Sequence, residues 1–238
     1  KMIKKIVVTG GSGRFAKHLK NTKIKHKILF PLKKTLNILN LKNLENFLKK
    51  NKPDIIIHLA GLSRPMSVHN KNIIKSIDLN IVGTANITKI CSDLNIKLIY
   101  FSTHYVYPGN KGNYSESDSL LPVNSYAWSK LGGECSVHLY KNSLILRVCM
   151  TEKPFVHKKA FANVKTSFMY HEDVAEILFK LLNKKGIINI GGKPQYIYNF
   201  AKKDNKNIKR MVLKKKNNFG MPKDSSLNLK KLRKIIKK

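Results

Sequence analysis

Two side chains near the middle of the chain have the types and the spacing for proton transfer. Tyr126 and Lys130 are four residues apart in a segment with a helical pattern, so both face the same side. A phenol with a pKa of about 10 is a poor acid or base at neutral pH, but a neighbouring ammonium lowers that pKa. Lys130 could also hydrogen-bond the ribose of a nicotinamide cofactor. The pair predicts proton and hydride chemistry, with a surface pair as the alternative.

A hydroxyl that could act on a substrate carbonyl precedes this pair. Ser102 and Thr103 lie at the end of an apolar run, residues 97–102, that predicts a strand. Ligands of open α/β sheets bind at the carboxyl ends of the strands. One of these hydroxyls is therefore expected to hydrogen-bond the substrate carbonyl and to complete a catalytic set with Tyr126 and Lys130.

A glycine-rich segment near the start could bind a dinucleotide. Gly10, Gly13 and Ala16 form a G-x-x-G-x-x-A pattern between a predicted strand and a predicted helix. Glycine lets the backbone approach a pyrophosphate, and the N-terminus of the following helix offers free N–H groups to that anion. An ordinary glycine turn is the alternative, but the position within a βαβ pattern favours the cofactor.

The end of the second predicted strand bears on the choice of cofactor. NAD-selective sites usually place an acid there, whereas this chain has Lys33 and Lys34. Together with Arg14, these lysines could contact a 2′-phosphate. We therefore expect NADPH, with NADH as the alternative and plain surface charge as the other interpretation of the lysines.

Alternating strands and helices form the framework for these residues. Strands are predicted at residues 3–9, 27–30, 54–60, 97–102 and 143–148. Helices are predicted at 14–20, from 41 until Pro53 ends the pattern, at 72–94 and at 125–140. This order predicts an α/β fold with a Rossmann-type, doubly wound parallel sheet and right-handed crossovers.

The pattern becomes sparser after residue 150. Expected there are a helix at 173–182, a short strand at 186–190, a further strand at 208–213 and a basic terminal helix at 227–236. We interpret residues 1–150 as a dinucleotide-binding Rossmann domain. Residues 151–238 would form a small C-terminal substrate lobe, partly interleaved with the first domain.

Composition restricts the class of protein. No run of apolar residues is long enough to span a membrane, and the first residues lack the pattern of a signal peptide. Cys91, Cys135 and Cys149 are scattered, without metal-binding spacing. We therefore expect a cytoplasmic protein with no metal site and no membrane partner.

The net charge of +34 allows two interpretations. Clustered cations would indicate nucleic-acid binding, but these lysines run through the whole chain, which favours a compositional bias. No nucleic-acid partner is expected, and a homodimer stays open. The positive field would attract small phosphorylated ligands such as a nucleotide sugar and NADPH.

Several segments together resemble the extended short-chain dehydrogenase/reductase family, most of all the dTDP-4-dehydrorhamnose reductases and their sugar-nucleotide relatives. The resemblance covers essentially the whole chain. The similar segments are TGGSGRFA, PDIIIHLAG, DLNIVGTANI, FSTHYVYPG, NSYAWSKLGGE, LILRV, SFMYHEDVA and PKDSSLNLKKL. The glycine loop and the Tyr/Lys segment are the most specific of them.

The resemblance implies roles for individual residues. Thr103 would polarise the substrate carbonyl, Tyr126 would donate the proton, and Lys130 would tune Tyr126 and hold the ribose. The implied cofactor-binding residues, of which Asn80 would support the site from the long helix, are Gly10, Ser12, Gly13, Arg14, Phe15, Leu59, Ala60, Gly61, Asn80, Ser102, Tyr126 and Lys130.

Departures from the family pattern narrow the expected reaction. His104 stands where the reductases have Asp, the 4,6-dehydratases begin an Asp-Glu pair, and the epimerase-reductases have Cys. Residues 148–168 form a shorter stretch than in the family, and Met221 replaces an Arg. Reduction of a 4-keto group on a nucleotide-linked deoxy sugar, in surface polysaccharide sugar biosynthesis, is expected. An NAD-dependent epimerase, in which His104 stands in for the Cys, and a non-catalytic dinucleotide-binding regulatory subunit are the alternatives.

Overall fold

A six-stranded sheet in the order β10-β5-β4-β3-β1-β2 forms the centre of the computed structural model, which describes residues 2–214 and 220–237. The strands are β1 (Lys5–Thr9), β2 (Lys27–Leu29), β3 (Ile55–His58), β4 (Lys97–Thr103), β5 (Ser143–Val148) and β10 (Gly186–Ile190). β1 pairs in parallel with β2 and β3, and β3 pairs in parallel with β4. The predicted α/β fold with a Rossmann-type parallel sheet is confirmed.

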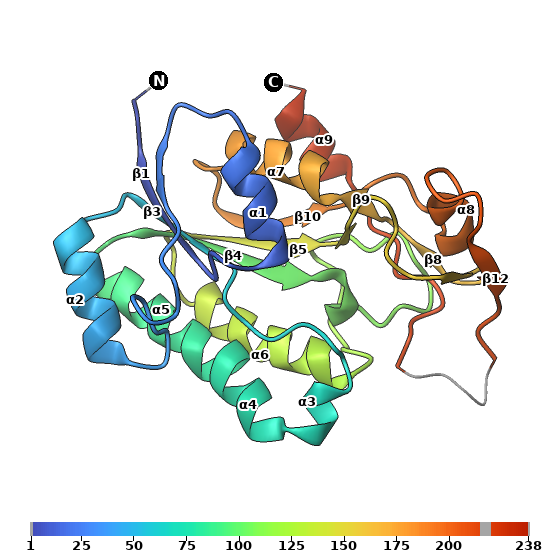
Figure 1. Ribbon diagram of the computed structural model, residues 1–238, viewed down its shortest axis with the longest axis horizontal. Helices are drawn as coiled ribbons and strands as arrows, with labels where there is room; N and C mark the ends of the chain where they lie inside the picture. The colour runs from blue at the N-terminus through green and yellow to red at the C-terminus, as the bar shows by residue number, and fades with distance from the viewer. Residues whose placement is uncertain (1, 215–219, 238) are drawn as a thin grey trace. The chain divides into compact units, whose positions relative to one another are not determined.

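Helices cover both faces of the strands near the N-terminus. Figure 1 shows α1 (Arg14–Asn21) on one face of β1, β3 and β4, and α2 (Leu41–Asn51), α5 (Gly83–Asp93) and α6 (Ser125–His138) on the other. The latter three helices pack on the sheet through fully buried side chains such as Leu44, Ile87 and Val137. Tyr100 of β4 lies in the same apolar cluster.

The helix predicted at residues 72–94 is wrong as one continuous element. The structure divides this region into α3 (Val68–Lys71), α4 (Ile73–Ile77), a π-helical turn η1 (Asp78–Val82) and α5. Asn72 caps α4 by accepting a hydrogen bond from the Lys75 N–H at 2.9 Å. The π turn holds Asn80, whose side chain bonds residues outside the helix. Turns of this kind are frequent at functional sites, and their causes lie in tertiary contacts rather than in local periodicity.

Short elements fill the rest of the chain. They are η2 (His104–Val106), β6 (Met150–Thr151), β7 (Lys159–Phe161), β8 (Lys165–Thr166), β9 (Met169–Tyr170), α7 (His171–Lys180), β11 (Gln195–Tyr196), α8 (Ile197–Ala201), β12 (Lys209–Met211) and α9 (Lys230–Ile236). The predicted strand at 208–213 corresponds to β12, which pairs with β7. The terminal helix begins later than predicted, because Leu227 forms a β-bridge with Tyr114 and the Asn228 N–H donates to the Tyr114 carbonyl.

The chain divides into two compact units. The first comprises Lys1–Ser102, Trp128–Leu146 and Leu181–Ile187, and the second comprises Thr103–Ala127, Arg147–Lys180 and Ile188–Lys238. The second unit has its own apolar cluster, which includes Phe155, Val164 and Phe200. The assignment of cofactor binding to residues 1–150 and of substrate binding to 151–238 stays a prediction. Within the described ranges no helix is both long and apolar enough to span a bilayer.

We predict that Gly133→Ala destabilises the protein. Alanine favours a helix over glycine by about 1 kcal/mol. At this position, however, a Cβ would lie 2.8 Å from the Tyr100 hydroxyl and would also collide with the Asn80 carbonyl oxygen. Overpacking of this kind costs about 1–3 kcal/mol, so the free energy of unfolding in urea should fall. Cys135→Ala, at an exposed position of the same helix, is the control, and a Gly133→Ala protein as stable as the wild type would contradict the packing.

Candidate functional site

The glycine loop places bare backbone at the end of β1. Gly10 has φ +69°, a left-handed conformation that favours glycine, and a Cβ there would lie 2.7 Å from the Ala60 N. The Gly13 N–H donates to the Gly10 carbonyl at 2.8 Å, and Gly13 precedes α1 without a side-chain cap. The start of α1 therefore has no side-chain cap, and a helix N-terminus of this kind fits the pyrophosphate of a dinucleotide.

A buried hydrogen-bond network fixes the loop after β3 against the glycine loop. Thr9 Oγ1 accepts from the N–H groups of Leu59 and Ala60 at 3.2 and 3.1 Å, and it lies 2.7 Å from His58 Nδ1. His58 Nε2 lies 3.1 Å from Thr84 Oγ1. Burial, and secondarily the charge of Lys130, lowers the pKa of His58 to about 3. His58 is therefore a neutral structural group.

Polar side chains near the glycine loop and after β2 could bind phosphate groups. Arg14 is exposed and donates to Ser63 Oγ at 3.4 Å, whereas Phe15 is buried against Phe101 with ring centroids 5.1 Å apart. Ser12 is exposed. After β2, an open depression is lined by Lys33, Lys34, Asn37, Asn40 and Asn43. The two cations and the amides form a surface that can accept an anion.

Asn80 connects the loop after β3 to α6. Its Oδ1 accepts from the Leu62 N–H at 2.6 Å, and its Nδ2 donates to the Leu62 carbonyl at 2.9 Å and to Ser129 Oγ at 2.8 Å. A Cβ on Gly61 would lie 2.8 Å from Asn80 Oδ1. Asn80 thus holds the loop that contains Gly61 beside the helix that carries Lys130.

Lys130 is a buried cation of the first unit. Its Nζ lies over the Tyr100 ring, 4.2 Å from the centroid, and the Tyr100 hydroxyl donates to the Lys130 carbonyl at 2.9 Å. Burial lowers the pKa of Lys130 to about 7, while the charge of Glu134 acts in the opposite direction. Ser102 Oγ donates to Glu134 Oε2 at 2.5 Å, so the hydroxyl proton of Ser102 is already engaged.

Thr103 and Tyr126 belong to the second unit. Thr103 is buried, and its Oγ1 accepts a hydrogen bond from the Tyr105 N–H at 3.3 Å at the start of η2. Its own hydroxyl proton can therefore point to a ligand. Tyr126 is half-buried in the first turn of α6, where Asn124 Oδ1 accepts from the Ala127 N–H at 2.9 Å. Because Tyr126 and Lys130 share α6 at a spacing of four residues, they lie on one side of that helix.

His104 is a structural residue rather than an acid or base. Its Nδ1 lies 3.2 Å from the Val148 carbonyl, which can only accept, so Nδ1 carries the hydrogen. Its Nε2 lies 3.5 Å from Thr166 Oγ1, and Thr166 in turn contacts Cys149 Sγ at 3.0 Å. Burial lowers the pKa of His104 to about 4. His104 is therefore neutral at physiological pH, with both nitrogens engaged.

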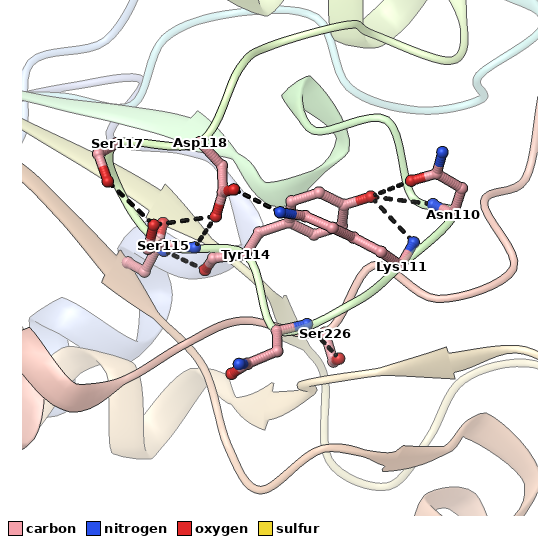
Figure 2. Close-up of polar contacts among 9 residues, drawn as sticks. Asn110, Lys111, Tyr114, Ser115, Ser117, Asp118 and Ser226 are labelled. Carbon is pink, nitrogen blue, oxygen red and sulfur yellow. Dashed lines mark hydrogen bonds and ion pairs between the residues drawn. The ribbon is translucent and has the colours of Figure 1, made fainter.

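The segment that follows His104 is fixed by its own side chains. Figure 2 shows the Tyr114 phenol facing Asn110 and Lys111: its oxygen accepts from their N–H groups at 3.0 and 3.2 Å and donates to Asn110 Oδ1 at 2.7 Å. Lys111 Nζ lies 2.5 Å from Asp118 Oδ1. The Tyr114 ring stacks on Tyr107 with centroids 4.9 Å apart. These contacts connect the segment from Asn110 to Asp118 internally and to Tyr107.

Each unit contains part of the predicted set. In the first, Thr9 holds Leu59 and Ala60 beside Gly10. In the second, the predicted members are Thr103 and Tyr126. The convergence of Thr103, Tyr126 and Lys130 stays a prediction. Sequence reasoning missed Tyr100 and Glu134, although Glu134 follows Lys130 by four residues, a spacing that signals a shared helix face.

One protein-family model matches most of the chain. The RmlD substrate binding domain model covers residues 4–185. A solved dTDP-4-dehydrorhamnose reductase from Bacillus anthracis, in complex with NADP, superposes with a TM-score of 0.85 at 23% identity, over 98% of this chain and 92% of that one. A hypothetical dTDP-4-dehydrorhamnose reductase from Sulfolobus tokodaii gives 0.83 at 25% identity, over 97% and 94%.

Curated relatives have several different functions. The chain is 33% identical to GDP-6-deoxy-D-talose 4-dehydrogenase of Aggregatibacter actinomycetemcomitans over 63% of its length and 52% of the relative. It is 32% identical to dTDP-D-glucose 4,6-dehydratase of Dictyostelium discoideum over 82% and 53%. It is 34% identical to methionine adenosyltransferase 2 subunit beta of Xenopus tropicalis over 48% and 34%. The chain thus spans between about a third and about half of these relatives.

The two neutral histidines predict a loss of stability in acid. Both pKa values lie below the ordinary 6.5, so the unfolded chain binds more protons and the stability contribution is lost as the pH falls from about 6.5 towards 4. The loss is on the order of 3 kcal/mol for each histidine. Urea unfolding of the wild type across this range should show a slope approaching two protons. His104→Asn, which can still donate to Val148, should reduce the slope by about one, and an unchanged slope would show that His104 does not titrate in this way.

Proposed function

The chain belongs to the RmlD substrate binding domain family, and from that premise we propose that it reduces the 4-keto group of a nucleotide-linked deoxy sugar with NAD(P)H, for surface polysaccharide sugars. The carrying observation is the buried ammonium of Lys130 on the same helix as Tyr126, four residues on. The relatives named for a 4-dehydrogenase and for 4-dehydrorhamnose reductases support a reaction at this carbon.

The bare glycine loop and the uncapped start of α1 fit a dinucleotide, so cofactor roles can be assigned to this chain's residues. The backbone of Gly10, Ser12, Gly13, Arg14 and Phe15 would hold the pyrophosphate. Leu59, Ala60 and Gly61, supported by Asn80, would line the next part of the cofactor. When bound, NADPH supplies the hydride that reduces the carbonyl carbon.

Tyr126 would act as the acid of the reaction. Its phenol gives a proton to the carbonyl oxygen as the C–H bond forms, and the phenolate left behind is stabilised by the Lys130 ammonium. The Thr103 hydroxyl, whose oxygen already accepts from the Tyr105 N–H, donates its hydrogen to the same carbonyl oxygen. One proton and one hydride thus convert the ketone to an alcohol.

An epimerase needs a further acid or base that this chain does not offer at position 104. Removal and return of a proton next to the carbonyl require a side chain that changes protonation state near neutral pH. His104 is buried, its nitrogens face Val148 and Thr166, and burial lowers its pKa to about 4. These contacts favour simple reduction over epimerisation.

A regulatory subunit is the second candidate, and the Xenopus tropicalis relative named as a transferase subunit supports it. The reductase and the regulatory subunit differ in whether they oxidise NADPH with a sugar-nucleotide substrate. A subunit would bind the dinucleotide without oxidising it in the presence of any 4-keto sugar nucleotide. Steady oxidation of NADPH by the purified chain with one member of a dTDP-, UDP- and GDP-linked panel would exclude this candidate.

We predict that Tyr126→Phe lowers kcat with a 4-keto sugar nucleotide by about 10²–10⁴-fold, because the acid is lost while the ring remains. NADPH binding, followed by fluorescence, should stay within about threefold, since a change of that size is well under 1.4 kcal/mol. Tyr196→Phe, at an exposed tyrosine, is the matched control and should turn over normally. Undiminished kcat in Tyr126→Phe would overturn the assigned role.

The cationic depression after β2 generates a prediction for cofactor choice. Replacing Lys33 and Lys34 by Ala should raise the Kd for NADPH by about tenfold or more, because a charge-assisted contact to the 2′-phosphate is worth at least about 1.4 kcal/mol. The Kd for NADH should change little. The matched control replaces Lys42 and Lys50, which are exposed on α2, and so tests the general loss of two positive charges. Equal weakening by both pairs would refute a specific phosphate contact.

A further inference from the structure

Strand β4 and helix α6 meet through two pairs of side chains in matching register. Tyr100 and Ser102 are two residues apart on β4 and face the same side, while Lys130 and Glu134 are four residues apart on α6. Two strand residues span about 6.6 Å and four helix residues about 6 Å. Lys130 Nζ therefore lies 4.2 Å from the centroid of the Tyr100 ring. In the second pair, Ser102 Oγ donates to Glu134 Oε2 at 2.5 Å.

All four side chains are buried. Tyr100 is 0% exposed, Glu134 3%, Ser102 6% and Lys130 9%. A buried ammonium or carboxylate costs several kcal/mol unless other groups compensate its charge. The ring face and the carboxylate provide this compensation for Lys130, since an aromatic face attracts a cation and a carboxylate opposes the effect of burial.

The placement of Glu134 is unusual for this chain. Lys and Arg number 47 against 13 Asp and Glu. Among residues 2–214 and 220–237, Glu134 is the one acidic residue whose side chain is buried. Burying a carboxylate beside a solvent-exposed lysine would cost more hydration free energy than the weak ion pair returns. Beside a buried lysine, the carboxylate offsets part of the cost of burying the ammonium.

The other titratable groups near Lys130 do not supply a negative charge. His58 and His69 are buried imidazoles, and burial together with the positive charge of Lys130 lowers the pKa of each. They remain neutral and cannot replace a carboxylate. Apart from Tyr126, the group that Lys130 is proposed to serve, the neighbours that favour its charged form are the Glu134 carboxylate and the Tyr100 ring.

We propose that Tyr100 and Glu134 are positioning residues for Lys130: the ring and the carboxylate, the latter oriented by Ser102, hold the ε-ammonium charged and in place beneath α6. The proposal deepens the proposed function, because only a protonated Lys130 can stabilise a Tyr126 phenolate. It assigns to β4 a second task besides carrying Thr103 at its end.

The first test measures the ionisation of Lys130 without any turnover. Competitive acetylation of the intact protein at a series of pH values, read by mass spectrometry of the Lys130 peptide and normalised to the exposed Lys42, gives the midpoint at which the amine loses its proton. Glu134→Gln keeps the shape and an acceptor for Ser102 but removes the charge. Its midpoint should fall by about one pH unit or more, a tenfold change in the ratio of ammonium to amine.

The ring is tested in the same way. Tyr100→Leu should lower the midpoint, and Tyr100→Phe, which keeps the aromatic face, should restore most of it. Cys135→Ser, exposed on the same helix, should leave it unchanged. Thermal unfolding confirms that each variant is folded. A midpoint that Glu134→Gln and Tyr100→Leu leave at the wild-type value would overturn the proposal, whatever the enzyme turns over.

The second test applies once turnover of a 4-keto sugar nucleotide is observed. In Glu134→Gln, kcat/KM should fall by about tenfold at pH 8 but by only about twofold at pH 6, because a midpoint lowered by one unit removes most of the remaining ammonium at the higher pH. An equal loss at both pH values would indicate a merely structural role and contradict the proposal. Failure to find any turnover would count against the proposed function alone, since the acetylation midpoints stand independently.

Discussion

A buried ammonium is the constraint around which much of the first unit is arranged. Lys130 projects from α6 towards Tyr100 of β4 and is buried. A buried charge of this kind is tolerated only where neighbouring groups compensate the loss of hydration. The Tyr100 ring can provide it because α6 approaches β4 closely. That approach depends on Gly133, where a Cβ would meet the Asn80 carbonyl and the Tyr100 hydroxyl. The glycine, the π turn that holds Asn80 and the strand residues therefore form one interdependent contact.

Burial lowers the pKa of Lys130, as it lowers the pKa values of His58 and His104. Lys130 has a carboxylate, Glu134, that opposes the effect of burial on its pKa. For His58 and His104 burial is the leading cause, and their pKa values fall to about 3 and about 4. Neutral imidazoles can donate from one nitrogen and accept at the other, which suits the Thr9–His58–Thr84 connection. The neutral histidines thus serve as hydrogen-bonding groups, whereas Lys130, with a pKa of about 7, depends on its neighbours to stay protonated.

Much of the framework could be predicted from the sequence, because β-branched runs and turn residues are local signals. The strand of residues 97–102 and the glycine loop lie where the pattern indicated. Two predictions were wrong because residues distant in sequence determine the structure there. The π turn depends on the hydrogen bonds of Asn80 with Leu62 and Ser129. Helix α9 begins late because the Asn228 N–H donates to the Tyr114 carbonyl. The candidate site shows the same division. Spacing within one helix reveals Tyr126 and Lys130, but the partnership of Tyr100 with Lys130 requires the register between a strand and a helix.

The histidine after Thr103 limits the chemistry that the second unit can support. A side chain that shuttles protons must release a ring nitrogen to the substrate, yet the Nδ1 hydrogen of His104 is directed to the Val148 carbonyl and its Nε2 faces Thr166. To bring His104 into the reaction, the protein would have to break these contacts and protonate a ring whose pKa is about 4. Tyr126 then remains the proposed proton donor among the predicted catalytic residues. A single donor suffices for reduction of a ketone, whereas dehydration and epimerisation each need a second group, so the packing of His104 supports the simplest reaction of the family.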